Sequence, residues 1–243
     1  MSDAPLIKRI KPRRPHGLKV IIHLNDDSEP FEVTLEALER SGLGVGDTLT
    51  RTIRHELLNH DADVRVRDAA LNLLSYRART RTELRRRLRQ KGFRPARIDV
   101  CLNHLQERGL IDDASVAAAF VRDRLRLRPK GRSALTSELR QKGIDQKLAR
   151  QTIDHVFESE QTNDLTLAQA AVTKWVGQQN PEALQALIDN SWSKAKQKVR
   201  RRLTAWLARR GFRGSAMNEA IDHAIHLASR KTDVESTSKK AET

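Results

Sequence analysis

The pentapeptide LRQKG occurs twice in this chain, at residues 88–92 and again at residues 139–143. The separation of 51 positions also places Leu84 on Leu135, and it matches apolar residues with apolar residues on both sides of the pentapeptide. At an offset of 119 the same pattern recurs in a third, more diverged copy. Internal repeats of this length are typical of folds in which small supersecondary units stack on one another. We therefore expect three tandem units from residue 65 onward.

Each copy is predicted to contain three helices. In the first copy these helices are expected at residues 66–77, 81–91 and 95–108. Thr80 and Glu83 form a capping box that starts the second helix. Gly92 supplies the left-handed conformation that ends it, and Gly143 and Gly211 occupy the same position in the later copies. The repeated pentapeptide is therefore the end of one helix together with the glycine that turns the chain into the next.

The boundary between the first two copies carries a pair of acidic residues. Asp112 and Asp113 follow apolar residues and precede a predicted helix. A carboxylate at this position accepts hydrogen bonds from the free amide groups of the first helical turn. We therefore interpret the pair as a helix start, in preference to a direct contact with a partner.

Residues 1–64 have a different character from the repeats. Residues 1–17 are basic, contain three prolines and are expected to form a flexible arm. The β-rich segments 18–24 and 31–35 flank turn-forming residues, which predicts a hairpin. Helical signals follow, one of them beginning from a cap at Asp47. A small α+β module is therefore expected ahead of the repeats.

The predicted fold is mostly α, because Leu, Ala, Arg, Glu and Gln are abundant and only 11 of 243 residues are glycine. The tandem, helix-turn-helix-like repeats are expected to form an elongated solenoid. Since the repeats lie in one chain, we expect a monomer. The expected boundaries are 1–17 for the basic arm, 18–64 for the α+β module, 65–111, 112–160 and 161–228 for the three repeats, and 229–243 for a disordered tail.

The formal net charge of +15 is unevenly distributed. Residues 77–150 hold 21 Lys and Arg but 8 Asp and Glu, whereas residues 20–64 hold 3 and 10. A strong positive field favours partners that carry negative charge. The first two repeats are therefore expected to face nucleic acid or an acidic protein surface.

Several other kinds of protein are disfavoured. Cys101 is the single cysteine and lies in line with apolar neighbours, so we expect a buried thiol and neither a disulfide nor a thiolate zinc site. His55 and His60 are five residues apart and point to different helical faces, and no phosphate loop or nucleophile elbow is apparent. We expect no metal, no cofactor and no enzymatic activity. The sequence has no apolar stretch of membrane-spanning length and no signal-peptide core, which indicates a cytoplasmic protein.

Three segments carry a family resemblance: ALNLLSYRARTRTELRRRLRQKGF (70–93), GLIDD (109–113) and AAAFVRDRLRLRPKGRSALTSELRQKGI (117–144). They resemble the RecX family of bacterial regulatory proteins, which modulate the recombinase RecA. The resemblance is good over 65–157 and weaker over 164–228, and it departs at Val116, where an aromatic residue is expected. It implies binding to the RecA filament on single-stranded DNA. It also implies lower RecA ATPase, strand-exchange and co-protease activity, and through these an influence on recombination, DNA repair and the SOS response.

The candidate contact surface is a basic strip on the first two repeats. Arg86 and Arg89 lie opposite the apolar stripe of their predicted helix, and Arg122 and Arg126 share one helical face. Like charges this close repel one another unless an anion neutralises them. The candidate residues for RecA or DNA binding are Arg85, Arg86, Arg89, Lys91, Arg122, Arg126, Arg128, Lys130, Arg132, Arg140 and Lys142.

The alternative is a helix-turn-helix protein that binds duplex DNA without RecA. Such proteins place a recognition helix in the major groove and usually dimerise. Here the units recur within one chain, and the third helices, RPARIDVCLNHLQE and DQKLARQTIDHV, are poor in clustered base-reading side chains. A sequence-selective duplex footprint that needs no RecA would favour this alternative.

Overall fold

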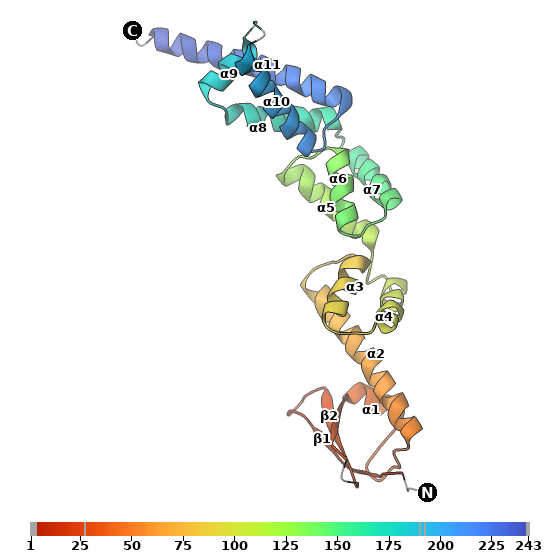
Figure 1. The fold of residues 1–243 in the computed structure, drawn as a ribbon. Helices are drawn as coiled ribbons and strands as arrows, with labels where there is room; N and C mark the ends of the chain where they lie inside the picture. Colours follow the sequence, from red (N-terminus) through yellow and green to blue (C-terminus); the bar gives the residue numbers. More distant parts are fainter. Residues whose placement is uncertain (1–3, 27, 190, 192, 242–243) are drawn as a thin grey trace. The chain divides into compact units, whose positions relative to one another are not determined.

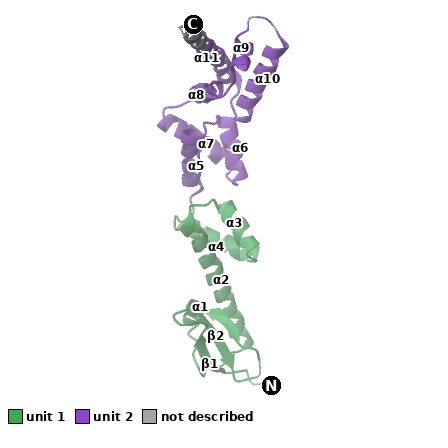
Figure 2. Cartoon of the chain, turned by 90° about the vertical axis from the view of Figure 1, so that its left-hand side faces the viewer, with its two compact units in different colours: residues 1–111 green, residues 112–243 purple. Residues whose placement is uncertain are grey.

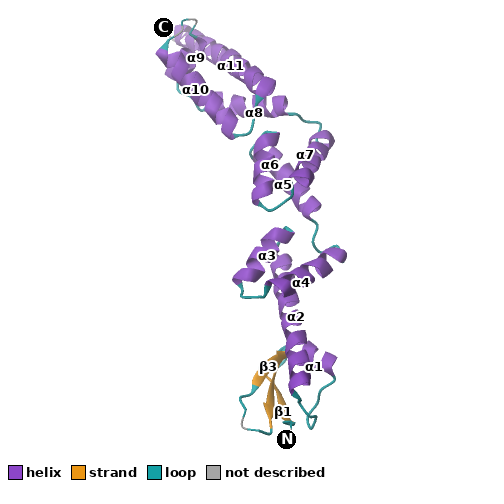
Figure 3. Cartoon of the chain, turned by 45° about the vertical axis from the view of Figure 1, so that its right-hand side comes forward, coloured by secondary structure: helices purple, strands orange, loops and turns teal. Residues whose placement is uncertain are grey.

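A computed structural model describes residues 4–26, 28–189, 191 and 193–241 of the chain (Figure 1). The chain divides into two compact units, residues 1–111 and 112–243 (Figure 2). Helices dominate both units, and the described strands lie at the start of the first (Figure 3). The expected fold class, mostly helical with a small α+β module at the N-terminus, is confirmed.

In the described residues the N-terminal module is a three-stranded antiparallel sheet with the order β1-β2-β3, followed by a short helix. The elements are β1 (Ile7–Pro12), β2 (Lys19–Leu24), β3 (Phe31–Thr34) and α1 (Leu35–Ser41). The predicted hairpin is confirmed, because β2 and β3 pair antiparallel with Val20 opposite Val33. Val20, Ile22 and Leu24 alternate along β2 and enter the core of the module.

The expectation of a flexible arm over residues 1–17 is wrong for residues 7–12, which form β1. Ile7 is 1% exposed, and Ile10 lies opposite Ile22 in the sheet. A register shift between Ile7 and Arg9 places Ile7 and Ile10 on the same, inward side of the sheet although they are three residues apart, and Arg9 and Lys11 lie on the other side. Pro12 stands at the last position of the strand, where a missing amide donor does not interrupt the pairing.

Helix α2 (Arg51–Tyr76) joins the module to the first repeat without a break. Its N-cap is Thr50, whose side chain accepts from the amide of Ile53 at 3.2 Å, and the prediction of a cap at Asp47 is therefore wrong. Val64 packs in the core of the module, whereas Val66 packs in the core of the first repeat. The expected boundary at residue 64 thus separates two cores but lies within one helix.

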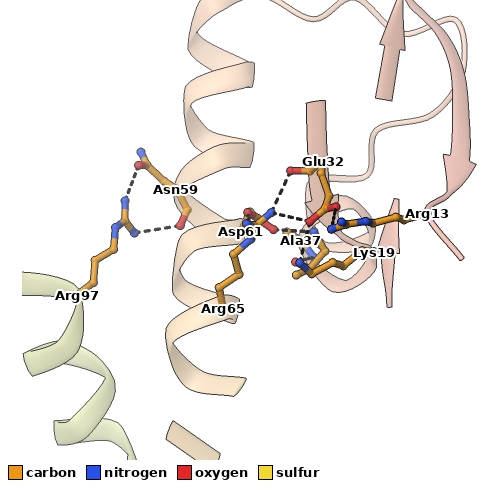
Figure 4. Close-up of polar contacts among 9 residues, drawn as sticks. Arg13, Lys19, Glu32, Ala37, Asn59, Asp61, Arg65 and Arg97 are labelled. Carbon is orange, nitrogen blue, oxygen red and sulfur yellow. Dashed lines mark hydrogen bonds and ion pairs between the residues drawn. The ribbon is translucent and has the colours of Figure 1, made fainter. Parts of the chain in front are cut away.

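A buried carboxylate fastens the sheet to α2 (Figure 4). Asp61 is 5% exposed, accepts from the amide of Thr34 at 2.6 Å and pairs with Arg65 at 2.7 Å. Arg65 also donates to the backbone oxygen of Glu32 at 3.1 Å. Two residues before Asp61 on α2, the backbone oxygen of Asn59 accepts from Arg97 of the first repeat at 3.0 Å. The polar contacts of α2 therefore reach both the sheet and the first repeat.

The repeats have the predicted three-helix layout. The first repeat contains the end of α2, α3 (Arg81–Gln90) and α4 (Pro95–Glu107). The second contains α5 (Asp113–Leu127), α6 (Arg132–Gln141) and α7 (Gln146–Ser159). The third contains α8 (Asp164–Gly177), α10 (Lys194–Arg209) and α11 (Gly214–Ala241), with α9 (Pro181–Ile188) in its extra segment.

The repeated glycines end the second helix of every repeat in the same way. Gly92, Gly143 and Gly211 have φ values of 87°, 80° and 84°. After each glycine an apolar residue donates its amide to a leucine carbonyl five positions earlier, as Phe93 does to Leu88 at 3.3 Å. This pair of left-handed glycine and returning hydrogen bond is a Schellman motif. The structure thus confirms the interpretation of LRQKG as a helix end.

Replacing Gly143 with Val is expected to destabilise the second unit by at least about 1–2 kcal/mol. A β-branched side chain is strained in the left-handed conformation that this position requires. Thermal unfolding of the full chain, followed by circular dichroism, measures the effect. An unchanged midpoint would show that the left-handed turn at Gly143 contributes nothing to stability.

Repeats two and three share a single hydrophobic core. Leu135 and Phe157 of the second repeat belong to the same buried cluster as Leu203 and Phe212 of the third. The first repeat has its own cluster, which contains Cys101. Burial raises the pKa of the Cys101 thiol, which agrees with the expected inert thiol.

Two glycines form the closest approach between repeats two and three. The amide of Gly131, at the N-terminus of α6, donates to the backbone oxygen of Arg210 at 2.8 Å. A Cβ atom on Gly131 would lie 2.5 Å from the backbone oxygen of Gly211, and a Cβ atom on Gly211 would lie 2.6 Å from the Cβ atom of Ala134. Both positions therefore need glycine for a steric reason. We call this contact the glycine seam.

The expectation of a disordered tail over residues 229–243 is wrong as far as Ala241, where α11 ends. The sequence from Ser215 to Ala241 contains neither glycine nor proline, so nothing stops the helix. Within α11, Ala220, Ala224 and Ala228 are buried against the shared core. Residues 242 and 243 lie outside the described residues.

Candidate functional site

The candidate cations of the first repeat lie on the exposed side of α3. Arg86, Arg89 and Lys91 are exposed, and no ion pair joins them to any residue within the described part of the first unit. Arg85 differs, because it pairs with Asp99 of α4 at 2.7 Å. The buried Leu84 and Leu88 fix the orientation of α3 and so direct the arginines outward. This side of α3 therefore carries uncompensated positive charge.

The candidate cations around α5 and α6 fall into two groups. Arg126, Arg128 and Arg140 are exposed, and the structure places none of the described carboxylates within ion-pair distance of them. Arg128 lies close enough to Arg210 that its charge, after the larger effect of burial, lowers the pKa of Arg210. Arg122 instead pairs with Glu160 at 3.3 Å. The first group is therefore available to an external anion.

Two of the predicted contact residues make contacts within the second unit. The side chain of Lys130 pairs with Glu138, which also accepts from Arg124 at 2.9 Å. Arg132 lies over the ring of Phe157 at 4.2 Å and pairs with Asp154. The sequence pattern assigned Lys130 and Arg132 to a binding surface, but these neighbours give both residues a structural role.

Further contacts tie α6 to its surroundings. The amide of Arg132 donates to Asp164 of α8 at 3.0 Å. Lys142 lies 5.0 Å from the centre of the Phe120 ring. Both contacts use candidate residues to hold helices together, and Arg140 is the α6 candidate that they leave exposed.

A groove of about 580 Å³ lies along α6 and α7. Its cations are Arg132, Arg140 and Arg150, and its carboxylate is Asp154, which Arg132 neutralises. Hydroxyl groups complete the polar lining: those of Ser133, Thr136 and Ser137. Guanidinium and hydroxyl donors together suit phosphate oxygens. Arg150 was not among the residues predicted from the sequence, because only the packing of α7 against α6 brings it beside the α6 cations.

The Lys130–Glu138–Arg124 group gives a pH-dependent prediction. Burial alone would raise the pKa of Glu138, but hydrogen bonds from Lys130 and Arg124 outweigh it and lower the pKa below its ordinary 4.5. Because the folded-state pKa is depressed, the stabilisation is complete above about pH 4.5 and is lost as the pH falls through the folded-state value.

Replacing Glu138 with Gln is expected to lower the free energy of unfolding by about 1–2 kcal/mol at neutral pH. The difference from the wild type should shrink when urea unfolding is repeated at the lowest pH at which the wild type stays folded, because the carboxylate becomes protonated as the pH falls below 4.5 and through the folded-state pKa. A difference that is equal at both pH values would contradict the assignment of a charge-dependent contact.

The acidic pair at 112 and 113 has the predicted helix-start geometry. Asp112 is the N-cap of α5, and its carboxylate accepts from the amides of Ala114 at 2.9 Å and Ser115 at 3.1 Å. The hydrogen bonds from Ser115 lower the pKa of Asp112. Asp113 is the first residue of α5. The expected structural role of Asp112 is therefore confirmed.

The candidate cations lie in both units. The α3 group is in residues 1–111, and the α5 and α6 groups are in residues 112–243. A single continuous basic strip across the two repeats stays a prediction. Within the described residues, no cluster of three or more His, Cys, Asp or Glu is arranged to hold a metal ion, and no helix is both long and apolar enough to cross a membrane.

Comparisons with known proteins identify the first two repeats as known family domains. The model of a family domain described as "RecX, first three-helix domain" matches residues 67–105, and that of "RecX, second three-helix domain" matches residues 112–153. The Regulatory protein RecX of Amycolatopsis mediterranei (strain U-32) is 32% identical over 148 residues, which are 61% of this chain and 76% of that protein. The chain belongs to the RecX family. The predicted family resemblance is therefore confirmed.

Similarity to other RecX proteins extends beyond the two matched domains. The RecX of Clostridium botulinum (strain Eklund 17B / Type B) is 23% identical over 222 residues, 91% of this chain and 97% of that protein. A solved crystal structure of regulatory protein RecX has a TM-score of 0.64 at 22% identity and covers 90% of this chain and 99% of its own. The RecX fold is thus shared across most of the chain. Residues 1–66 precede both family domains.

Proposed function

We propose that this RecX protein binds the RecA filament on single-stranded DNA in the cytoplasm and lowers its ATPase, strand-exchange and co-protease activities. Through these activities it would restrain recombinational DNA repair and the SOS response. Family membership supports a regulatory role, and the proposal extends it to the filament. The regulator acts by binding, and no catalytic step is assigned to it.

The observation that carries the proposal is the exposed, uncompensated charge on α3, α5 and α6. Buried leucines fix α3 and α6, and buried Ala117 and Val121 fix α5. The described residues offer no carboxylate partner to the cations that these helices carry: Arg86, Arg89, Arg126, Arg128 and Arg140. Holding such charges close together costs free energy until an anion neutralises them. A filament that presents a phosphate backbone together with protein carboxylates supplies that anion.

One contact in the first repeat weakens the duplex-reading alternative. In a helix-turn-helix protein, the third helix would offer its Asn and Gln side chains to base edges. However, Arg81 at the start of α3 donates hydrogen bonds to two side chains of α4, to Asn103 at 2.5 Å and to Gln106 at 3.0 Å. These amides are engaged within the repeat. The geometry therefore favours contacts with a backbone or a protein surface over base reading.

Co-sedimentation with RecA tests the proposal. RecA is assembled on single-stranded DNA with a slowly hydrolysed nucleotide, and the full chain is added before centrifugation. We expect the chain to pellet with the filament and to reduce DNA-dependent ATP hydrolysis in a parallel assay. If it remains in the supernatant and hydrolysis is unchanged, while a selection over random duplexes enriches a defined site, the duplex-reading alternative replaces the proposal.

The elongated shape and the monomeric state stay predictions of the tandem repeats. Small-angle scattering with light-scattering mass determination checks both. We expect the mass of one chain and a distance distribution with a long tail. A symmetric distribution, or the mass of a dimer, would contradict them.

A further inference from the structure

The solvent-facing side of the N-terminal sheet carries a second group of cations. Val20, Ile22 and Leu24 of β2 point into the core, so the intervening Lys19, Ile21 and His23 lie on the opposite side of the sheet. Directly opposite residues of an antiparallel pair share a face. This side of the sheet is therefore defined by the odd-numbered residues of β2 and their partners.

The register of β1 adds two cations to this face. Arg9 lies opposite His23, and Lys11 lies opposite Ile21. Opposite residues have Cβ atoms about 5 Å apart, and residues two apart on a strand are about 7 Å apart. Arg9, Lys11 and His23 therefore form one compact group, which we call the sheet cation group.

Charge compensation differs between the two ends of the face, and Figure 4 shows the end around Glu32. At one end, Glu32 accepts from Arg13 and from Lys19 at 2.7 Å. At the other end, Arg9 and Lys11 are exposed, and no described carboxylate lies within ion-pair distance of Arg9, Lys11 or His23. The sheet cation group is therefore the uncompensated part of the face.

The cations of the group also affect the pKa of His23. Desolvation, and then the positive charges of Arg9 and Lys11, lower the pKa of His23. A groove of about 400 Å³ borders Arg9 and His23, and the carboxylate of Asp26 on its rim already accepts hydrogen bonds from Ser28. An anion beside Arg9 and Lys11 would relieve their repulsion. The sheet thus offers a concave, cationic edge next to a flat cationic face.

We infer that the sheet cation group binds the phosphate backbone of nucleic acid, with Arg9 and Lys11 each contacting a phosphate. A backbone contact fits better than base stacking, because the face defined by Arg9, Lys11, Ile21 and His23 presents no Phe, Tyr or Trp side chain among its described residues. The contact is independent of RecA. It assigns a role to a module that lies outside both family domains.

The test measures binding of the full chain to a labelled single-stranded oligonucleotide of mixed sequence, without RecA, by fluorescence anisotropy over a range of salt concentrations. The variant is Arg9→Gln with Lys11→Gln. Losing two phosphate contacts should weaken binding about tenfold at low ionic strength and flatten the slope of log K against log salt by about 1.4. The unfolding temperature should stay the same, because both side chains are exposed.

Two matched variants make the result specific. Arg51→Gln with Lys174→Gln removes the same charge from exposed positions outside the group and should leave the slope unchanged. Arg9→Lys with Lys11→Arg keeps the charge and should keep the affinity. Equal slopes for the Arg9/Lys11 variant and the Arg51/Lys174 control would overturn the inference. So would a loss of binding to polyglutamate without a loss for DNA, which would assign the group to an acidic protein.

The outcomes are separable from the proposed regulation of RecA. If the Arg9/Lys11 variant binds the oligonucleotide as the wild type does, the proposal that the helical cations bind the RecA filament is not affected. A failure to co-sediment with RecA leaves the sheet contact with free DNA untouched.

Discussion

Replacing Arg126, Arg128 and Arg140 together with Glu should abolish inhibition of the RecA ATPase while the second unit stays folded. All three side chains are exposed, and none forms an ion pair with another described residue, so the change removes no internal contact. It reverses the charge of the surface on which the proposed binding depends. If all three contact single-strand phosphates, the slope of log K against log salt for filament binding should flatten by about 2.

A matched variant separates the site from net charge. Lys174, Lys198 and Arg230 are exposed cations elsewhere in the second unit, and their replacement with Glu changes the net charge by the same amount. The Lys174/Lys198/Arg230 variant should still inhibit the RecA ATPase. Equal loss of inhibition in both variants would reduce the proposed site to general electrostatic attraction. Lys130 and Arg132 are unsuitable for this test, because their pairing with Glu138 and Asp154 confounds binding with stability.

Replacing Gly211 with Ala should destabilise the second unit by about 3 kcal/mol or more. The left-handed conformation costs an alanine about 1–2 kcal/mol, and forcing a methyl group into a packed contact costs about 1–3 kcal/mol in addition. The methyl group would meet Ala134 across the glycine seam, where backbone as well as side chain blocks it. Repeats two and three would have to separate locally to admit it.

Gly92→Ala is the matched control for this prediction. Gly92 occupies the equivalent position in the first repeat with φ 87°, but no described heavy atom lies within 4 Å of the Cβ it would gain. The Gly92→Ala substitution should therefore lower the free energy of unfolding only by the cost of the left-handed conformation, about 1–2 kcal/mol. Trp175, Trp192 and Trp206 all lie in residues 112–243, so tryptophan fluorescence during urea unfolding measures the cost of the Gly211 variant. Circular dichroism, which also detects the helices of residues 1–111, measures the cost of the Gly92 variant. Equal costs for the two variants would show that the seam has no steric role.

The elements that were predictable from the sequence are those that local interactions determine. Helix ends at Gly92 and Gly143, and the start of α5 at Asp112, depend on residues within one turn of the helix. Because the sequence repeats, a signal recognised in one copy predicted the same feature at the equivalent positions of the other two copies. For this reason the three-helix layout was correct even in the diverged third repeat.

The errors arose where distant partners decide the structure. Strand β1 is basic and carries Pro12, and only its pairing with β2 reveals the buried Ile7. The continuity of α2 was predictable, because residues 51–76 contain neither glycine nor proline, but a change in charge composition suggested a boundary there. A change in composition marks a change of core and does not by itself interrupt a helix.

The candidate binding residues were likewise predicted only in part. The sequence identified the cations, but their carboxylate partners come from other helices, such as Asp154 of α7 for Arg132 and Asp99 of α4 for Arg85. Spacing within one helix cannot show which arginine another helix neutralises. The distinction between structural and available cations therefore required the packing of the helices.

The passage of α2 through two cores restricts how this part of the chain can change in length. Each residue of an α-helix adds a rotation of about 100°. One extra residue between Val64 and Val66 would thus turn the first repeat away from the face on which the sheet packs, whereas seven extra residues would restore the facing to within about 20°. Insertions and deletions in the middle of α2 should therefore be tolerated in multiples of seven, a phase requirement that a flexible linker would not impose.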